Sequence, residues 1–137
     1  MLLGLDLGTT NVKALVTDLA GRHLSDASCP VRLFPLGDGG VEQDIEEIWS
    51  ATLTAVRGAV RSVDASGIRA VGVSSQGGAL QMLDARGRPS GRVISWLDQR
   101  GTCSGQTLTA ELGQEWFAQR IGHCGAGFAA GPLLRLR

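Results

Sequence analysis

The residues near the N-terminus that are best suited to chemistry form the stretch Asp6-Leu7-Gly8-Thr9-Thr10. Gly8 lets the backbone approach a phosphate closely, and adjacent N–H groups in a tight turn can point into one concavity. The hydroxyls of Thr9 and Thr10 add donors without adding charge. Asp6 could face a magnesium ion through water, because Mg²⁺ prefers oxygen ligands and keeps much of its hydration. The stretch therefore suits the binding of phosphate groups together with magnesium.

Two widespread phosphate-binding motifs do not occur here. The stretch lacks the GxxxxGK[ST] pattern of a P-loop and the GxGxxG pattern of a dinucleotide fold, which excludes those two solutions. Taken alone, DLGTT is most often the turn of an ordinary β-hairpin. Its function therefore depends on what the rest of the chain places around it.

Composition narrows the classes of partner. The chain has 137 residues, the usual size of one domain, with thirteen basic and thirteen acidic side chains and 4% aromatic residues. This balance disfavours nucleic acid and membrane surfaces as partners and favours a small molecule. Neither a secretion signal nor a membrane span is recognisable, so a cytoplasmic protein is expected. Cys29, Cys103 and Cys124 have neither zinc-site nor disulfide spacing and are expected to be reduced thiols.

The elements before the first long loop are predicted to be strands. Leu2–Leu7 and Asn11–Thr17 are rich in apolar residues and flank the Gly-Thr-Thr turn, and His23–Leu33 follows a second turn at Asp18–Arg22. Three consecutive strands with short turns make an antiparallel meander. The Pro- and Gly-rich stretch Phe34–Gly40 is predicted to be a loop.

The period of the pattern changes after this loop. Apolar residues at spacings of three and four predict a helix over Asp44–Val63, with Asp44 and Glu47 as a capping box. Trp49 is expected to anchor the core. A helix of this length can return the chain for parallel pairing, so Ile68–Ser74 is predicted to be a strand buried on both faces.

The C-terminal part of the sequence predicts a short hairpin and helices. Ala79–Leu83 and Arg92–Ile94 flank a turn at Asp84–Pro89. A helix is expected over Thr107–Ile121, broken near its internal glycine, Gly113. Leu133–Arg137 has the pattern of a helix that is beginning.

The order of several motifs resembles that of the FGGY carbohydrate kinases, which phosphorylate sugars and polyols. These motifs are DLGTT between two strands, DLAG, VEQD before the IW-containing helix, VGVSSQGG, the D-x-x-G-x-P turn and ISWLDQR. The resemblance runs from Met1 to about Arg100 and weakens over Gly101–Arg137. It implies an α/β, actin-like or ribonuclease H-like fold with a mixed sheet: an antiparallel three-strand meander, a crossover helix and a parallel strand. Residues 1–137 would form an incomplete N-terminal domain, without the C-terminal ATPase domain.

The same resemblance implies a reaction and a set of site residues. The γ-phosphate of ATP would pass to a hydroxyl of a sugar or polyol, with Mg²⁺ as the metal. Gly8, Thr9 and Thr10 would contact the ATP phosphates, and Asp6 would face the metal indirectly. Trp96 would lie against a carbon-rich face of the sugar. The full set expected to bind the sugar is Gln76, Gly77, Gly78, Trp96, Asp98 and Arg100.

Two departures from the family pattern limit what can be expected. Gly77 and Gly78 stand where glycerol kinases carry Arg-Glu and xylulokinases carry Met-His, so the sugar cannot be named by analogy. The catalytic aspartate of the family lies well downstream, so it is expected beyond Arg137 and the chain alone is expected to be inactive. Asp98 could serve as the base instead, but an ion pair with Arg100 is the favoured interpretation.

Three hypotheses about function therefore stay open. The chain is the N-terminal portion of an ATP-dependent sugar kinase, an inactive sugar- or nucleotide-binding module, or another kinase or ATPase of the actin-like superfold. The VEQD and SWLDQR stretches argue against the third. The sheet is also expected to end at an exposed parallel edge, and Leu133, Leu134 and Leu136 are expected to lack packing partners. Both expectations predict poor solubility or self-association.

Overall fold

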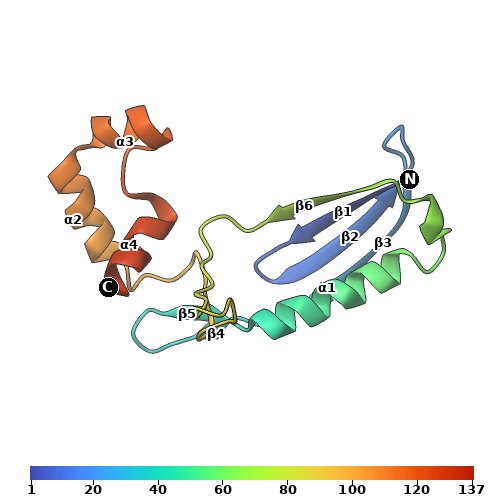
Figure 1. The fold of residues 1–137 in the computed structure, drawn as a ribbon, viewed down its shortest axis with the longest axis horizontal. Coiled ribbons are helices and arrows are strands. Elements are labelled where there is room, and N and C mark those ends of the chain that lie inside the picture. The colour runs from blue at the N-terminus through green and yellow to red at the C-terminus, as the bar shows by residue number, and fades with distance from the viewer. The chain divides into compact units, whose positions relative to one another are not determined.

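The computed structural model describes residues 1–126 and 129–137 in full and residues 127–128 by their backbone alone. The chain divides into two compact units (Figure 1). The first unit comprises Met1–Leu33 and Gln43–Gln76, and the second comprises Phe34–Glu42 and Gly77–Arg137. The architecture is α/β with a mixed sheet, as the sequence predicted.

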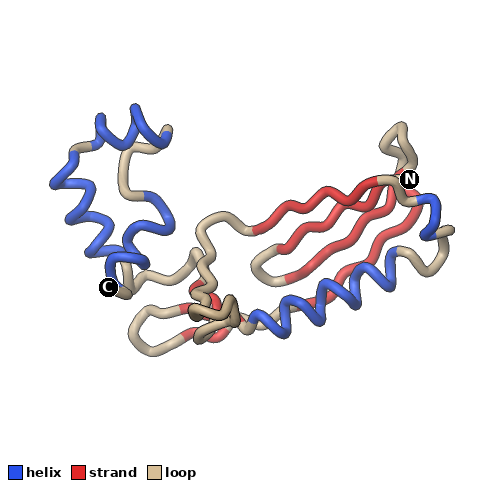
Figure 2. Tube along the Cα trace, in the orientation of Figure 1, coloured by secondary structure: helices blue, strands red, loops and turns tan.

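The first unit is built on a four-stranded sheet, with strands drawn red in Figure 2. Its strands are β1 (Leu2–Leu7), β2 (Asn11–Thr17), β3 (His23–Pro30) and β6 (Ala70–Ser75), in the order β3-β2-β1-β6. β1 pairs antiparallel with β2 and β2 antiparallel with β3, whereas β6 runs parallel to β1. The predicted meander and the predicted parallel strand are confirmed, although β3 ends before the predicted Leu33.

Helix α1 (Ile45–Ala59) covers β2 and β3 (Figure 1). It begins as predicted at Asp44, whose side chain accepts hydrogen bonds from two backbone N–H groups of the first turn. Small residues let the helix approach the sheet closely, since a Cβ on Gly58 would lie 2.7 Å from the Cβ of Ala27. The helix ends earlier than predicted, at Ala59. The buried core beneath it consists of Leu3, Val12, Ala14, Val16, Val31, Ala51, Ala55 and Ala59.

Two expectations about burial in this unit are wrong. Trp49 is 58% exposed, because the buried side of α1 is the line of Ala51, Ala55 and Ala59, and Trp49 lies outside that line. The strand expected to be buried on both faces is β6, and every one of its residues is exposed. β6 is the edge of the sheet, where it pairs only with β1 while α1 packs on β2 and β3.

The second unit contains a small sheet of short strands, with the order β4-β5-β7. They are β4 (Phe34–Pro35), β5 (Val41–Gln43) and β7 (Val93–Ile94), and β5 ends at the residue where the chain re-enters the first unit. The sequence predicted only a loop where β4 lies and did not predict β5. The first arm of the predicted hairpin is reduced to isolated bridges, from Leu80 to Ile94 and from Leu83 to Pro89.

The remaining helices are short. The 3-10 helix η1 (Ala65–Gly67) precedes β6, and α2 (Thr102–Leu112), α3 (Gln114–Ile121) and α4 (Gly127–Arg135) lie in the second unit. The predicted break at Gly113 is confirmed, since this glycine has a φ of 83° and separates α2 from α3. α2 and α4 both begin earlier than predicted, and they pack closely. Among the described residues, no helix has the length and apolarity that crossing a membrane requires.

Candidate functional site

The Gly-Thr-Thr turn joins β1 to β2 and is held tightly by backbone contacts. The Gly8 N–H donates to the carbonyl of Asn11 at 3.1 Å, and a Cβ on Gly8 would lie only 2.7 Å from that oxygen. The turn therefore requires glycine at this position. On its other side, the Thr10 carbonyl accepts a hydrogen bond from the Val31 N–H at 3.0 Å. Both ends of the turn are thus tied to neighbouring strand ends.

A buried glutamine connects this turn to the end of β6. Gln43 has no solvent-exposed surface, and its Nε2 donates to the Thr9 carbonyl at 2.9 Å. Its Oε1 accepts from Nε2 of Gln76 at 2.7 Å, and the Gln76 backbone N–H donates to the Leu7 carbonyl at 3.1 Å. Oε1 of Gln76 is buried without a partner among the described residues. We call the Thr9 carbonyl, Gln43 and Gln76 together the amide link.

Asp6 lies on the sheet face opposite α1, because side chains alternate along a strand and its neighbours in β1 face the helix. Lys13 of β2 is its direct cross-strand partner in register, and Ser74 of β6 is its parallel neighbour. Its Oδ2 lies 3.8 Å from the position that a Cβ on Gly8 would take, so the carboxylate points toward the turn. In the described part of the chain, no three His, Cys, Asp or Glu side chains gather as a metal cage.

The residues predicted to bind the sugar fall in two segments. Gln76 ends the first unit and belongs to the amide link, while Gly77 and Gly78 begin the second unit. Gly77 is exposed, and a Cβ there would meet nothing within 4 Å. Gly78 has a φ of 80°, a conformation that favours glycine. Trp96, Asp98 and Arg100 follow β7 in the second unit.

Trp96 lines a hollow of about 680 Å³ in the second unit, and 43% of its surface is exposed. The walls come from the segment after β7, from α2, the start of α3 and α4, and from the loops beside them. Most of the lining is small or apolar, and Thr102, Gln106 and Gln114 add uncharged polar groups. The described lining residues are Trp96, Asp98, Gly101, Thr102, Gly105, Gln106, Thr109, Ala110, Gly113, Gln114, Ala126, Gly131 and Pro132.

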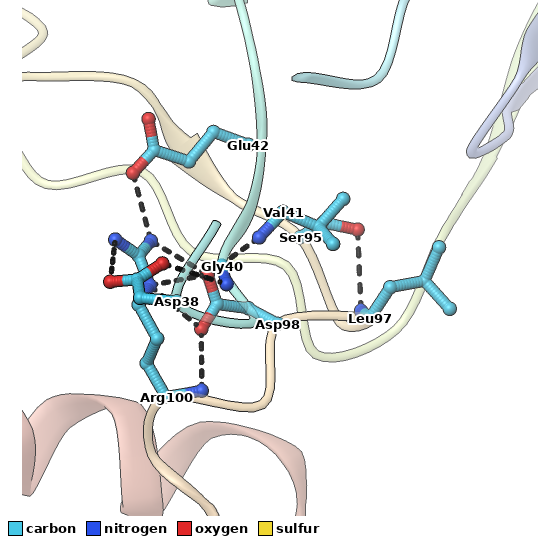
Figure 3. Close-up of polar contacts among 8 residues, drawn as sticks. All are labelled: Asp38, Gly40, Val41, Glu42, Ser95, Leu97, Asp98 and Arg100. Atoms are coloured by element: carbon cyan, nitrogen blue, oxygen red, sulfur yellow. Dashed lines mark hydrogen bonds and ion pairs between the residues drawn. The ribbon is translucent and has the colours of Figure 1, made fainter. Parts of the chain in front are cut away.

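The two charged residues of the SWLDQR stretch form an ion-pair cluster (Figure 3). Arg100 donates to Asp98 at 2.6 Å and to Glu42 at 2.8 Å, and Asp38 lies 3.9 Å away. Asp98 also accepts from the Val41 N–H at 3.0 Å, which ties the start of β5 to this stretch. The side chain of Asp98 is 1% exposed and that of Arg100 is 11% exposed. We call these four charged residues the Arg100 cluster.

These contacts shift the pKa values of both partners. Burial pushes the pKa of Asp98 upward, but hydrogen bonds from the Arg100 side chain and from two backbone N–H groups outweigh it. The pKa of Asp98 therefore lies below its usual value. Hydrogen bonds to Asp98 and Glu42 raise the pKa of Arg100. The ion pair between Asp98 and Arg100, favoured from the sequence, is present in the structure.

Sequence reasoning missed three residues in these networks. The sequence does not mark Gln43, Glu42 or Asp38 as site residues, although VEQD indicates the entry to the helix. Their partners lie up to 62 residues away along the chain, from Asp38 to Arg100. The one local signal is the density of polar side chains between Asp38 and Asp44, which is unusual for a stretch that contains a buried residue.

Comparison with known proteins places these features in a family. Residues 1–135 match the N-terminal domain of the FGGY family of carbohydrate kinases. A glycerol kinase from Rhodospirillum centenum is 36% identical over 124 residues, covering 88% of this chain and 25% of that protein. A glycerol kinase from Roseiflexus is 33% identical over 133 residues, covering 94% of this chain and 26% of that protein. The chain thus spans about a quarter of the length of the curated relatives it matches.

Solved structures agree with this placement. A xyloylose kinase from Brucella ovis superposes with a TM-score of 0.87 at 31% identity, covering 97% of this chain and 28% of that one. A Plasmodium falciparum glycerol kinase with ADP shares the fold, with a TM-score of 0.84 at 21% identity, covering 98% of this chain and 28% of that one. The motif order predicted the same assignment. The chain belongs to the FGGY family of carbohydrate kinases, and it corresponds to the N-terminal domain of that family.

Proposed function

We propose that this chain supplies the phosphate-binding turn and part of the acceptor pocket of an ATP-dependent kinase that phosphorylates a hydroxyl of a neutral sugar or polyol. The observation that carries the proposal is that both threonine carbonyls of the turn accept hydrogen bonds from neighbouring segments. The Thr9 carbonyl accepts from the Gln43 side chain, and the Thr10 carbonyl accepts from the Val31 N–H. In a trans peptide the N–H points away from the carbonyl. Each of these hydrogen bonds therefore directs the N–H of the next residue away from the group that binds the carbonyl. An anion-binding turn requires N–H groups that point away from the protein interior in this way.

In this proposal, Gly8, Thr9 and Thr10 hold the phosphates of ATP. Phosphoryl transfer needs positioning and neutralisation of charge more than covalent help from the protein. The backbone N–H groups and the two threonine hydroxyls are neutral hydrogen-bond donors for these phosphates. The need for glycine at position 8 follows from its contact with Asn11, and it also keeps the turn free of a side chain.

Asp6 fits the magnesium ion that kinases of this kind usually need. Mg²⁺ is commonly bound through one or two carboxylates together with substrate phosphates, and it keeps several waters. The exposed carboxylate of Asp6 points toward the turn and matches that requirement. When bound, the ion would neutralise charge on the phosphates.

The hollow beside Trp96 is the proposed acceptor pocket. An exposed indole suits the carbon-rich face of a sugar, and Thr102, Gln106 and Gln114 offer hydrogen bonds to hydroxyls. Among the described lining residues Asp98 is the charged one, and Arg100 already neutralises it. This lining favours a neutral sugar or polyol over an acidic sugar.

The remaining predicted sugar contacts have different environments. Gly77 has open space around it and no side chain to contact a substrate, and Gly78 has a φ of 80°, which favours glycine. The polar groups of Asp98 and Arg100 are engaged with each other, and Gln76 is engaged with Gln43, so we assign these three a shaping role. Asp98 is also a weak base, because its pKa is lowered. We therefore propose that the proton acceptor for the attacking hydroxyl is supplied by a part of the kinase other than residues 1–137.

Two further proposals concern the setting of the protein. We propose a cytoplasmic location, because ATP, the proposed donor, is available there. We also propose that residues 1–137 self-associate when they are isolated. Val71 and Val73 of the edge strand β6 are 56% and 64% exposed, and an unpaired strand edge is a template for pairing with another chain.

A chimeric enzyme tests the proposed activity. Residues 1–137 would replace the matching quarter of the Rhodospirillum centenum glycerol kinase, and ADP release would be measured with polyols, pentoses, hexoses and aldonic acids. We expect magnesium-dependent turnover with a neutral acceptor and none with an aldonic acid. Absence of turnover with every acceptor, by a folded chimera, would contradict the proposal.

A paired substitution tests the role of the turn within that chimera. Thr9→Val with Thr10→Val is expected to lower kcat/KM for ATP by at least about a hundredfold, because hydrogen bonds to charged groups are each worth about 1.5–3 kcal/mol. Thr54→Val is the matched control, since Thr54 is an exposed threonine on α1 whose hydroxyl bonds to its own helix. An equal effect of both changes would remove the phosphate role from the turn.

A further inference from the structure

We propose that Gln43 is a positioning residue for the phosphate-binding turn, and that it acts by orienting the peptide unit between Thr9 and Thr10. This inference rests on the proposed function, because it assigns a task to the turn that the function requires. It adds a residue of β5 to the machinery of the site.

The direction of the amide link follows from its first member. The Thr9 carbonyl can only accept a hydrogen bond, so the group that Gln43 turns toward it must be the Nε2 amide. Oε1 of Gln43 then faces the other way and can only accept, so Gln76 must present its own Nε2. Exchanging the oxygen and nitrogen of either side chain would place two acceptors or two donors against each other. The orientation of both amides is therefore determined by a backbone carbonyl.

The held carbonyl determines where the next N–H points. The Thr9 carbonyl and the Thr10 N–H belong to one planar trans peptide unit and point in opposite directions. A hydrogen bond that holds the carbonyl toward the buried amide of Gln43 therefore holds the N–H away from it. Without Gln43, this peptide unit could rotate between the anchored positions Gly8 and Thr10. Gln43 thus selects the orientation in which the Thr10 N–H is available to a phosphate.

Burial makes this hold stiff. Gln43 is completely buried, and a buried amide costs free energy unless it is hydrogen-bonded. Rotation of the Thr9 carbonyl away from Gln43 would leave the Nε2 donor of Gln43 without this partner in a place that water does not reach. The neighbouring residue Asp44 caps α1, so the backbone that carries Gln43 is itself fixed. The amide link therefore resists the rotation that would weaken phosphate binding.

Steady-state kinetics of the chimera separate this role from a contribution to packing. Gln43→Met removes both bonds of Gln43 with little change in shape, and Gln43→Glu keeps the acceptor for Gln76 but loses the donor to Thr9. We expect each change to raise the KM for ATP about five- to tenfold, the effect of one lost hydrogen bond.

The matched control is Val16→Ala, which alters a completely buried residue of β2 at the end remote from the turn. It is expected to lower the melting temperature without changing the KM for ATP. The inference is overturned if both changes at Gln43 leave the KM for ATP unchanged, or if Val16→Ala raises it equally. A chimera without turnover contradicts the proposed function, and hydrogen exchange then decides the inference.

Backbone hydrogen exchange of the chimera tests the orientation directly. The probe is the magnesium complex of ADP. In the unsubstituted protein, we expect it to slow the exchange of the Thr10 N–H at least tenfold, and we expect Gln43→Glu to abolish that protection. If the nucleotide leaves the exchange of Thr10 unchanged in the unsubstituted protein, the inference is wrong. Protection that persists in Gln43→Glu would also overturn it.

Discussion

The two units hold their functional segments with opposite kinds of chemistry. In the first unit, the neutral amide link joins the Gly-Thr-Thr turn to Gln76 through Gln43. In the second, the Arg100 cluster joins the start of β5 to the stretch after β7 through charged groups (Figure 3). Both connect residues that are distant along the chain. The amide link and the Arg100 cluster differ in the strength of their bonds and in the groups that are left without a partner when one member is removed.

Removing one member is expected to cost a different amount of stability in the neutral network and in the charged network. Loss of one amide leaves donors and acceptors without partners, at a cost of about 1–3 kcal/mol for each buried group. Loss of one charged partner leaves an uncompensated buried charge, which costs about 3–5 kcal/mol. The amide link also carries no titratable group, so its strength does not depend on pH. The neutral arrangement suits the phosphate-binding role that we propose for the turn, because it adds no charge next to the anion.

The largest effect is expected from removing the cation of the Arg100 cluster. Arg100→Met leaves Asp98, with its side chain 1% exposed, beside Glu42 without a counter-charge. We expect the free energy of unfolding to fall by about 3 kcal/mol, the low end of the range for a broken buried pair. Urea denaturation followed by tryptophan fluorescence measures this loss.

A second arginine provides the control for this comparison. Arg32 pairs with Glu47, but its side chain is 73% exposed, so Arg32→Met is expected to cost far less. Arg100→Lys keeps the charge but loses the planar guanidinium group that can bond two carboxylates at once. Its loss in free energy of unfolding should lie between those of Arg100→Met and Arg32→Met. Equal losses for Arg100→Met and Arg32→Met would show that burial of the cluster contributes nothing.

A smaller loss of stability is expected from breaking the amide link. Gln43→Met removes the partner of the Thr9 carbonyl and of the Gln76 amide, while the methionine fills the same space. We expect the free energy of unfolding to fall by about 2 kcal/mol, because two groups lose their bonds but no charge is stranded. The same urea titration measures it. A loss greater than that of Arg100→Met would reverse the proposed ranking of the two networks.

The two networks should also differ in their response to acid. The pKa of Asp98 is lower in the folded protein than its usual value, so between these two values the unfolded chain binds the proton that the folded chain does not. The stability that Asp98 contributes is therefore complete above about pH 4 and is lost as the pH falls through the folded pKa. The loss caused by Asp98→Asn should shrink in this acid range.

The amide link provides the comparison for that pH series. The loss caused by Gln43→Met should stay constant across the same range, because neither glutamine titrates. Urea midpoints at successive pH values give both differences. A pH-independent loss for Asp98→Asn would mean that its carboxylate gains no net stabilisation from Arg100.

The sequence predicted well the elements that depend on neighbouring residues. The boundaries of β1 and β2, the cap at Asp44 and the break at Gly113 all agree with the structure. Each of these rests on contacts within a few positions. The parallel pairing of β6 followed from the length of the intervening helix, which is also a local quantity.

Features that depend on distant partners were not predictable in the same way. Trp49 matched an apolar spacing, yet the alanines of α1 form the buried face, because only small side chains allow the close approach to β3. The roles of Gln43 and Arg100 depend on partners 33 to 62 residues away. For the candidate site, the sequence predicted which residues belong to it, but it did not predict which of them hold one another.

The smallest effects on stability are expected at a type of turn that occurs once in each unit. Asp18 and Asp84 each begin a D-x-x-G-R turn, and each side chain accepts from two backbone N–H groups and pairs with the arginine four residues on. These contacts lower the pKa of both carboxyls, chiefly through the backbone bonds. Both turns are exposed and belong to separate units.

Asp18→Asn and Asp84→Asn should therefore cause small and equal losses in melting temperature, each below the loss caused by Gln43→Met. Asparagine keeps one acceptor oxygen for the backbone N–H groups and loses only the exposed ion pair, which is screened by water. Differential scanning calorimetry in low and high salt tests this, since the losses should vanish in high salt. Unequal losses in melting temperature would contradict this expectation. They would mean that the contribution of such a turn depends on the unit in which it lies, although its hydrogen bonds are made within its own five residues.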